Sequence, residues 1–259
     1  MSDWLLNLPI VWMTVVVFGF TYLVAAGIYA LVTSLAKGDR RLAFKAISPG
    51  LLSPLGVVFG LFVVFTAAQV WNDNERANTA VDREASALRD VMIFAATFPG
   101  EPDVCLRALI RRHIEQAVHQ EWPMMAKGTA TLRFTPTPLA EALQVTLALA
   151  ISGEGQKAAQ SGMAAALEAA FDARRQRIII SQSRVSLVKW LCLFVQAACA
   201  LFATAMIHCD NRLASALAMG LFATGVAASV LLIASHDQPF SGEISVGPEP
   251  LLQVMPDAR

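Results

Sequence analysis

The chain has 259 residues, of which 56% are hydrophobic and 15% are charged, and its mean hydropathy is +0.53. This composition is typical of a membrane protein and argues against an ordinary soluble domain. The formal net charge is zero, so no global field attracts nucleic acid. Basic and aromatic residues are not interleaved on one face as nucleic-acid binding requires, and no nucleic-acid partner is expected.

Four apolar segments contain no Asp, Glu, Lys or Arg, and each reaches the roughly 20 residues that a transmembrane helix needs. These segments are Ile10–Ala36, Ala46–Asn72, Trp190–Cys209 and Leu213–Ser235. The sequence predicts membrane spans at about 8–35, 51–71, 188–208 and 213–235. We therefore expect a multi-pass protein of the inner cell membrane, whose first partner is the lipid bilayer.

The segment between the second and third spans is charged, amphipathic and free of strand-like alternation. The sequence predicts an all-α integral membrane protein with four transmembrane helices in a 2+2 arrangement around an inserted helical soluble domain. In this organisation the first transmembrane hairpin covers residues 1–72, the soluble domain 73–184 and the second hairpin 185–235. An extended C-terminal tail, 236–259, completes the chain.

The second span is predicted to continue into the soluble domain as one helix. Neither Gly nor Pro occurs from Leu61 to Phe98. Apolar residues continue at helical spacing beyond the membrane, at Val81, Ala85, Leu88, Met92 and Ala95. An unbroken helix over this range is roughly 55 Å long, which exceeds the thickness of the bilayer's hydrocarbon core.

Three further helices are expected in the soluble domain. Amphipathic spacing predicts one at about Pro102–Lys127, after a Pro- and Gly-rich turn, and another at about Leu139–Ile151. Neither Gly nor Pro occurs from Met163 to Met219, so we expect a third helix to run without a break into the third span.

The charges flanking the spans do not settle the orientation. The short loop after span one is basic, with Lys37, Arg40, Arg41 and Lys45, and the positive-inside rule would place this loop in the cytoplasm. The segments of the soluble domain nearest the membrane are also rich in arginine, which favours the opposite topology. Both orientations stay open.

The interiors of the predicted spans contain no Asp, Glu, Lys or Arg. Ion pumps and proton-coupled transporters usually need such a group to bind or relay the ion. The sequence therefore favours passive permeation or simple anchoring over active transport.

Span two contains the candidate pore-lining residues, Phe59, Phe62, Phe65 and Gln69. Facing the axis of an oligomer, the phenylalanine rings would form a hydrophobic constriction that gates by dewetting. Facing lipid, they are ordinary membrane residues, and this is the simpler interpretation because apolar aromatic residues occur in any span.

The sequence predicts no enzyme, no metal and no cofactor. It contains no nucleophile elbow, phosphate-binding loop or paired catalytic carboxylates. Glu115 and His119 are four residues apart, but two ligands do not make a metal site. We expect His113 and His119 to lie on a solvated helix face. Next to this segment, Glu121 beside Trp122 is expected to anchor packing within the domain, with an ion-binding surface as the alternative.

Several features occur together in one known family. They are the long helix after span two, Glu121-Trp122, Arg174 and Arg177 ahead of span three, and the exit motif His236-Asp237-x-Pro239-Phe240-x-Gly242. With this set the chain resembles the bestrophin-like family of bacterial multi-pass membrane proteins, a domain of unknown function distantly related to bestrophin anion channels.

The resemblance implies a homo-oligomer, a pentamer if it follows the bestrophins, that passively conducts small anions. Span two would then line the pore, and Phe62 and Phe65 would form its neck. The alternative hypothesis is a membrane-anchored interaction or regulatory protein whose helical domain binds a partner.

Overall fold

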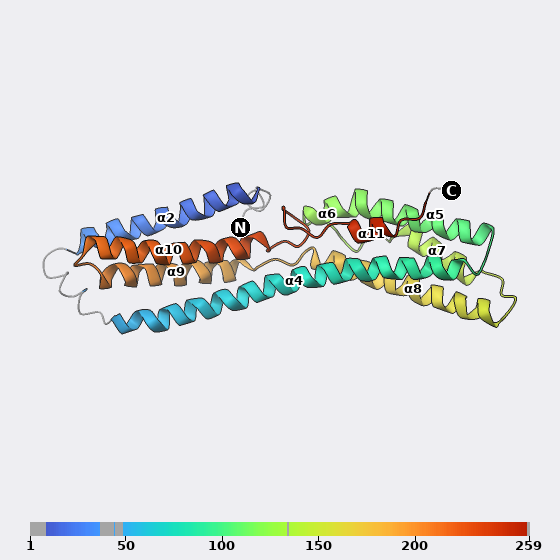
Figure 1. Ribbon diagram of the computed structural model, residues 1–259, viewed down its shortest axis with the longest axis horizontal. Helices are drawn as coiled ribbons and strands as arrows, with labels where there is room; N and C mark the ends of the chain where they lie inside the picture. Colours follow the sequence, from blue (N-terminus) through green and yellow to red (C-terminus); the bar gives the residue numbers. More distant parts are fainter. Residues whose placement is uncertain (1–8, 37–43, 45–48, 134, 258–259) are drawn as a thin grey trace. The chain divides into compact units, whose positions relative to one another are not determined.

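The computed structural model describes residues 9–36, 44, 49–133 and 135–257, and within these ranges it contains helices and no strand (Figure 1). The all-α class predicted from the sequence is confirmed. The longer helices are α2 (Ile10–Leu35), α4 (Leu52–Ala95), α5 (Glu101–Gln116), α7 (Thr137–Leu147), α8 (Glu154–Ile180), α9 (Leu187–Ile207) and α10 (Arg212–Ser235). The shorter ones are the 3-10 turn η1 (Pro49–Leu51), the π-helical turn η2 (Ala117–Glu121), α6 (Trp122–Ala126) and α11 (Glu249–Gln253).

The chain divides into two compact units. The first combines Met1–Trp71 with Arg184–Asp237, and the second combines Asn72–Ser183 with Gln238–Arg259. We call them the membrane unit and the polar unit. Each is described by itself below.

The membrane unit contains the apolar helices. Among the described residues, four helical segments are long and apolar enough to cross a membrane: Ile10–Leu35, Pro49–Ala95, Leu187–Ile207 and Arg212–Ser235. Helices α2, α9 and α10 pack through buried apolar residues that include Val17, Leu193 and Val226. Helix α4 adds Phe59 to this core, and its ring lies 5.8 Å from the ring of Phe222. These contacts leave the interior of the unit filled with apolar side chains.

Helix α4 is a single helix of 44 residues. The predicted continuation of span two is therefore confirmed, and its physical basis is the absence of any helix-breaking residue after the first turns. Pro54 lies in the first turn, where a missing N–H removes no helical hydrogen bond. Beyond Asn72 the predicted apolar stripe is buried, with Val81, Leu88 and Ala95 fully enclosed.

The polar unit is a bundle of the C-terminal half of α4 with α5, α7 and α8. Its core consists of aliphatic residues placed at helical spacing, such as Leu88, Leu106, Ile110, Leu139 and Leu167, each with no exposed surface. The predicted apolar face of the helix after Pro102 is thus the buried face of α5. Burial of this kind, rather than helix propensity, provides most of the stability of such helices.

One helix prediction is wrong. Helix α8 ends at Ile180 and α9 begins at Leu187, so the polar segment and the third span are not joined by continuous helix. In this linker the side chain of Gln182 donates to the carbonyl of Ala130, and the hydroxyl of Ser183 donates to the carboxylate of Asp73. The backbone N–H of Val185 bonds to the side chain of Asp237 instead of a helical carbonyl. The side chain of Ser186 then caps the start of α9 by accepting from the N–H of Lys189, so the helix is interrupted here without Gly or Pro.

Three other boundaries differ from the predictions. The helix expected at 102–127 is interrupted by the π-helical turn η2, and the helix expected at 139–151 is the shorter α7. The tail that was expected to be extended includes α11, whose second residue is Pro250. The basic loop that bears on orientation, from Lys37 to Lys45, lies almost entirely outside the described residues, so both topologies stay open.

The linker between α8 and α9 yields a test. The backbone N–H of Val185 donates to Oδ1 of Asp237 at 2.6 Å, and Asp237 is buried. Asp237→Ala removes the acceptor and leaves a buried amide unpaired, so we expect a loss of about 1–3 kcal/mol of stability. Asp237→Asn keeps an acceptor oxygen and should lose less. Thermal unfolding of the detergent-solubilised protein measures both, and equal losses would contradict this explanation.

Candidate functional site

The polar unit contains a buried cluster of charged residues built around helix α8. Arg174 and Arg177 lie about one turn apart among the buried residues of α8. Arg177 has no exposed surface, and Arg174 is 6% exposed. A buried guanidinium is strongly destabilising unless carboxylates balance its charge and accept its hydrogen bonds.

The first balancing carboxylate is Glu84 on α4, which is also completely buried. Arg177 Nε donates to Oε2 of Glu84 at 2.8 Å, and Arg177 Nη2 donates to Oε1 at 3.1 Å. This is the bidentate geometry in which a guanidinium and a carboxylate bind most strongly.

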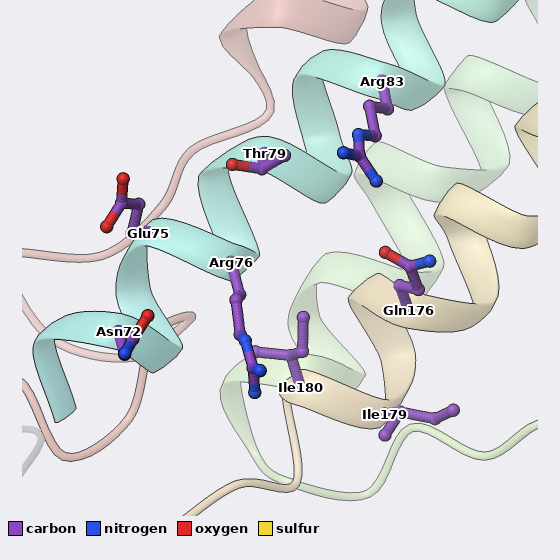
Figure 2. Close-up of a pocket in the computed structure, with 8 residues that line it drawn as sticks. All are labelled: Asn72, Glu75, Arg76, Thr79, Arg83, Gln176, Ile179 and Ile180. Carbon is purple, nitrogen blue, oxygen red and sulfur yellow. The ribbon is translucent and has the colours of Figure 1, made fainter. Parts of the chain in front are cut away.

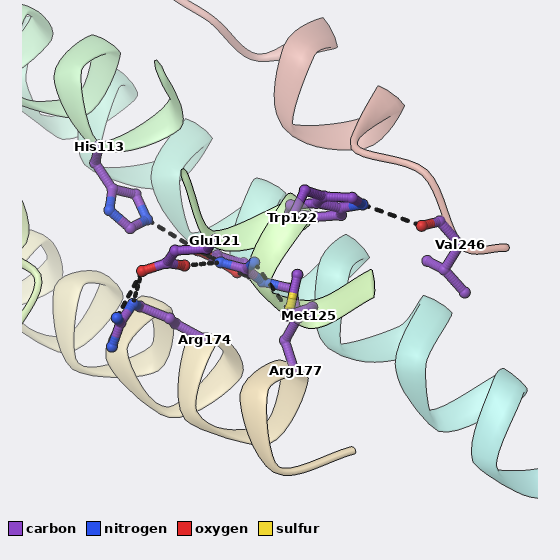
Figure 3. Close-up of polar contacts among 8 residues, drawn as sticks. His113, Glu121, Trp122, Met125, Arg174, Arg177 and Val246 are labelled. Carbon is purple, nitrogen blue, oxygen red and sulfur yellow. Dashed lines mark hydrogen bonds and ion pairs between the residues drawn. The ribbon is translucent and has the colours of Figure 1, made fainter. Parts of the chain in front are cut away.

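The second balancing carboxylate is Glu121, the last residue of the π-helical turn η2 (Figure 3). Its Oε2 accepts from Arg177 Nη2 at 2.9 Å. Its Oε1 accepts from Arg174 Nε at 2.8 Å and from Arg174 Nη2 at 2.6 Å. Glu121 therefore bridges the two arginines, and the two carboxylates balance the two guanidinium groups.

The π-helical turn has a local cause. Pro123 lacks the N–H that would bond to the carbonyl of His119, and its ring disfavours a regular α-helical turn before it. The wider turn η2 ends two residues before this proline. Such turns are rare and often occur at functional sites.

His113 on α5 completes the cluster, and its predicted solvated position is wrong. The residue is 1% exposed, and its Nε2 lies 2.8 Å from Oε1 of Glu84. Since that oxygen belongs to an ionised carboxylate, Nε2 carries the proton and donates it.

The cluster also controls the ionisation of its own groups. Burial by itself would raise the pKa of Glu84, but the charge of Arg177 and the hydrogen bond from His113 outweigh it and lower the pKa from 4.5 to about 2. For Arg177, burial opposes the charged form, yet Glu84 and Glu121 raise its pKa. Both groups are therefore ionised at neutral pH.

Trp122 connects the cluster to the C-terminal tail. The ring centroid of Trp122 is 4.5 Å from the guanidinium carbon of Arg177, which is a cation–π contact. On its other side, Trp122 Nε1 donates to the carbonyl of Val246 at 3.1 Å, as Figure 3 shows, and its ring meets the ring of Phe240 edge-on. The expectation that Glu121-Trp122 anchors packing thus corresponds to specific contacts.

The exit motif divides between the two units. In the membrane unit, His236 stacks on Trp71 at 6.2 Å, and burial raises the pKa of Asp237 although the hydrogen bond from Val185 opposes this shift. In the polar unit, the carbonyl of Pro239 accepts from the N–H of Val246 at 2.7 Å. Gly242 has a φ of +86°, a conformation that favours glycine.

The pore-lining candidates do not share one environment. Phe59 is buried against Phe222, Phe62 is partly buried in the same cluster, and Phe65 is 72% exposed. Gln69 accepts a hydrogen bond from Nζ of Lys189 at the start of α9. Phe65 is therefore the candidate with the most exposed ring.

The arrangement of the buried cluster is suited to holding helices together. Its charges bind one another, and its side chains are almost excluded from solvent. Within the part of the chain that the structure describes, no three His, Cys, Asp or Glu side chains are grouped so that they could hold a metal ion.

Sequence reasoning missed Glu84, the residue on which Arg177 depends. A signal was present, because Glu84 falls between Val81 and Leu88 on the stripe predicted to be buried. An acidic residue in an apolar stripe indicates a buried partner of opposite charge. Glu121 carries the same signal, since it follows the buried residue Ala117 by four positions where the apolar face of α5 continues into η2.

Residues 19–251 match the Bestrophin-like domain. The chain belongs to the bestrophin-like family. The match spans both units, so it covers the apolar helices as well as the buried charge cluster. A comparison with curated protein sequences finds no significant match.

Solved structures give the same fold. Two crystal structures of variants of a bacterial bestrophin homologue from Klebsiella pneumoniae match with TM-scores of 0.71 and 0.73, at 12% and 10% sequence identity. Each comparison covers 92% of this chain, and 96% and 97% of the other. A third crystal structure, of a variant membrane protein, matches with a TM-score of 0.71 at 13% identity over 93% of this chain and 99% of that one. This bestrophin-like protein therefore has the fold of membrane proteins that share little of its sequence.

The charge cluster yields a stability test. Glu84→Gln preserves the shape of the side chain but leaves Arg177 with less negative charge in the core, so we expect a loss of about 3–5 kcal/mol. Asp82→Asn is the matched control, because Asp82 is an exposed acidic residue on the same helix, and it should change stability by less than about 0.5 kcal/mol. Chemical denaturation in detergent measures both, and similar effects would contradict a structural role for Glu84.

The lowered pKa of Glu84 yields a second test. A carboxyl whose folded pKa is depressed from 4.5 to about 2 stabilises the fold above pH 4.5 and loses this effect as the pH falls towards 2. Between pH 6 and pH 3 the wild type should therefore lose roughly 2 kcal/mol more stability than Glu84→Gln. Denaturation curves at the two pH values measure this difference. Parallel losses in both proteins would show that Glu84 keeps an ordinary pKa.

Proposed function

We propose that this protein forms a homo-oligomeric channel in the inner cell membrane that passively conducts small anions. Its family and its fold favour this function over an enzyme. The observation that carries the proposal is the long exposed face of α4, which changes from apolar to basic along one helix.

The exposed face of α4 has regular spacing. Residues three or four positions apart point in nearly the same direction on a helix. One such series is exposed in the single chain along the middle part of α4, at Leu61, Phe65, Ala68, Asn72, Arg76, Thr79 and Arg83. The first three residues are apolar and the rest are polar or basic. This order suits a hydrophobic neck that opens into a wider aqueous passage.

The path is proposed to lie between copies of the chain rather than within one. In the described residues, the interior of the membrane unit is filled by apolar side chains such as Val17, Leu193 and Val226. Packing of this kind leaves no room for hydrated ions. A ring of subunits, five if the likeness to bestrophins extends to stoichiometry, would place the exposed face of each α4 around a central axis.

The distribution of charge supports passive conduction of anions. The apolar segments of the described helices carry no Asp, Glu, Lys or Arg in their interiors, and charged residues there normally bind or relay the driving ion in pumps. Arg76 and Arg83 are exposed on the same face of α4 as Phe65. Positive side chains along a passage raise the local concentration of anions.

Native mass spectrometry of the particle in nanodiscs tests the assembly. We expect a ring-sized oligomer, because a shared pore requires several copies of α4. A monomer would leave no shared path, and a membrane-anchored protein whose polar unit binds a partner would then be the better hypothesis.

Flux of chloride in liposomes tests the neck. Phe65→Ala should raise the flux severalfold, because a smaller side chain widens and wets the constriction. Phe20→Ala on α2 is the matched control, since Phe20 is also an exposed aromatic residue of an apolar helix. Flux that both substitutions change equally, or that is absent under every gradient, would overturn the assignment of Phe65.

A further inference from the structure

The polar unit has a groove between α4 and α8, which Figure 2 shows in close-up. Its cavity volume is about 570 Å³. That volume lies within the range of small-molecule sites and exceeds what a simple ion needs. The lining residues are Asn72, Glu75, Arg76, Thr79, Arg83, Gln176, Ile179 and Ile180.

Most of the arginines near this groove are already paired. Arg107, Arg111 and Arg175 pair with carboxylates on their own helices, and Arg174 and Arg177 pair inside the core. Arg76 and Arg83 form no ion pair or hydrogen bond with any residue that the structure describes. Their guanidinium groups are therefore available to a ligand.

The placement of the two arginines suits a single anionic group. They are seven residues apart on α4. This spacing separates them by roughly 10 Å along the helix axis, but both side chains leave the helix on nearly the same side. Thr79 lies between them on the same face. Long arginine side chains can converge on a group between such positions, and each guanidinium presents a fork of N–H donors that matches phosphate oxygens.

Other groove residues complement the arginines. Gln176 on α8 and Asn72 on α4 each supply an amide that can donate to an anion. Glu75 is the acidic residue in the lining, and in Figure 2 its carboxylate points away from α8. Ile179 and Ile180 give the α8 side an apolar surface, which suits the organic part of a larger ligand.

We infer that this groove binds a phosphate group, either of a soluble phosphate compound or of a phospholipid headgroup. Guanidinium groups bind phosphate bidentately, and the unpaired state of both arginines leaves their donors for it. The same arginines lie on the face proposed to line the passage, but the inference does not require ion conduction. Phosphate binding without chloride flux would contradict the channel and leave this site intact, and chloride flux without phosphate binding would do the reverse.

A calorimetric titration tests the site. The full-length protein in a neutral detergent is titrated with inorganic phosphate, and the heat of binding is measured. Arg76→Gln and Arg83→Gln should each weaken binding about tenfold, because each removes a charge-assisted contact. Arg89→Gln is the matched control: Arg89 is an exposed, unpaired arginine on another face of the same helix. It should leave the affinity within about twofold.

A second arm identifies the source of the phosphate. The titration is repeated in nanodiscs of phosphatidylcholine with and without phosphatidylglycerol. Competition by phosphatidylglycerol, together with loss of co-purified phosphatidylglycerol in Arg76→Gln and Arg83→Gln, indicates a lipid headgroup. Phosphate binding that is unchanged by the lipid indicates a soluble ligand. Either outcome supports the groove as a phosphate site.

Two outcomes would overturn the inference. One is no saturable binding of phosphate and no retention of phosphatidylglycerol. The other is equal weakening by Arg89→Gln, which would reflect net charge alone. Arg83→Lys keeps the positive charge but removes the guanidinium fork, so this variant should bind phosphate with intermediate affinity. It provides a decisive test if a glutamine variant does not fold.

Discussion

Burial of Arg177 is the constraint on which the polar unit depends. A guanidinium without solvent contact requires carboxylates at fixed positions, and these come from two other segments, Glu84 on α4 and Glu121 on the π-helical turn. Each partner is specified by the directions of the N–H groups. A buried ion pair adds little net stability compared with apolar packing, but a misplaced partner is strongly unfavourable. The network therefore fixes how the helices align more than how tightly they pack.

The same constraint orders the end of the chain. Arg177 meets the face of Trp122, and Trp122 donates to the backbone of the tail at Val246 and packs against Phe240. Arg111 reaches the carbonyl of Pro256 as well. The described part of the tail, 238–257, has only one short helix, α11, so these contacts with the bundle supply the order that its sequence lacks.

Features that depend on long sequence patterns were predicted from the sequence, and contacts between pairs of distant residues were missed. Length and hydropathy were sufficient for the apolar helices, and the spacing of Val81, Leu88 and Ala95 was sufficient for the unbroken α4. The pairing of Glu84 with Arg177 spans 93 positions, and no local pattern encodes it. The end of α8 was missed for a related reason, because Asp73, Ala130 and Asp237, which bond to the linker, are distant in sequence.

Helix α4 carries charges of two kinds, and their environments separate structural from functional roles. Glu84 faces the core, where leaving it unpaired would be unfavourable by several kcal/mol, and its partners are complete. Arg76 and Arg83 line an open groove, where solvent exposure makes a protein partner unnecessary. Selection for stability alone explains the first kind but not the second, since exposed, unpaired arginines on one face add almost nothing to folding. Their regular spacing along an otherwise exposed face is therefore better explained by what that face binds or conducts than by how the bundle folds.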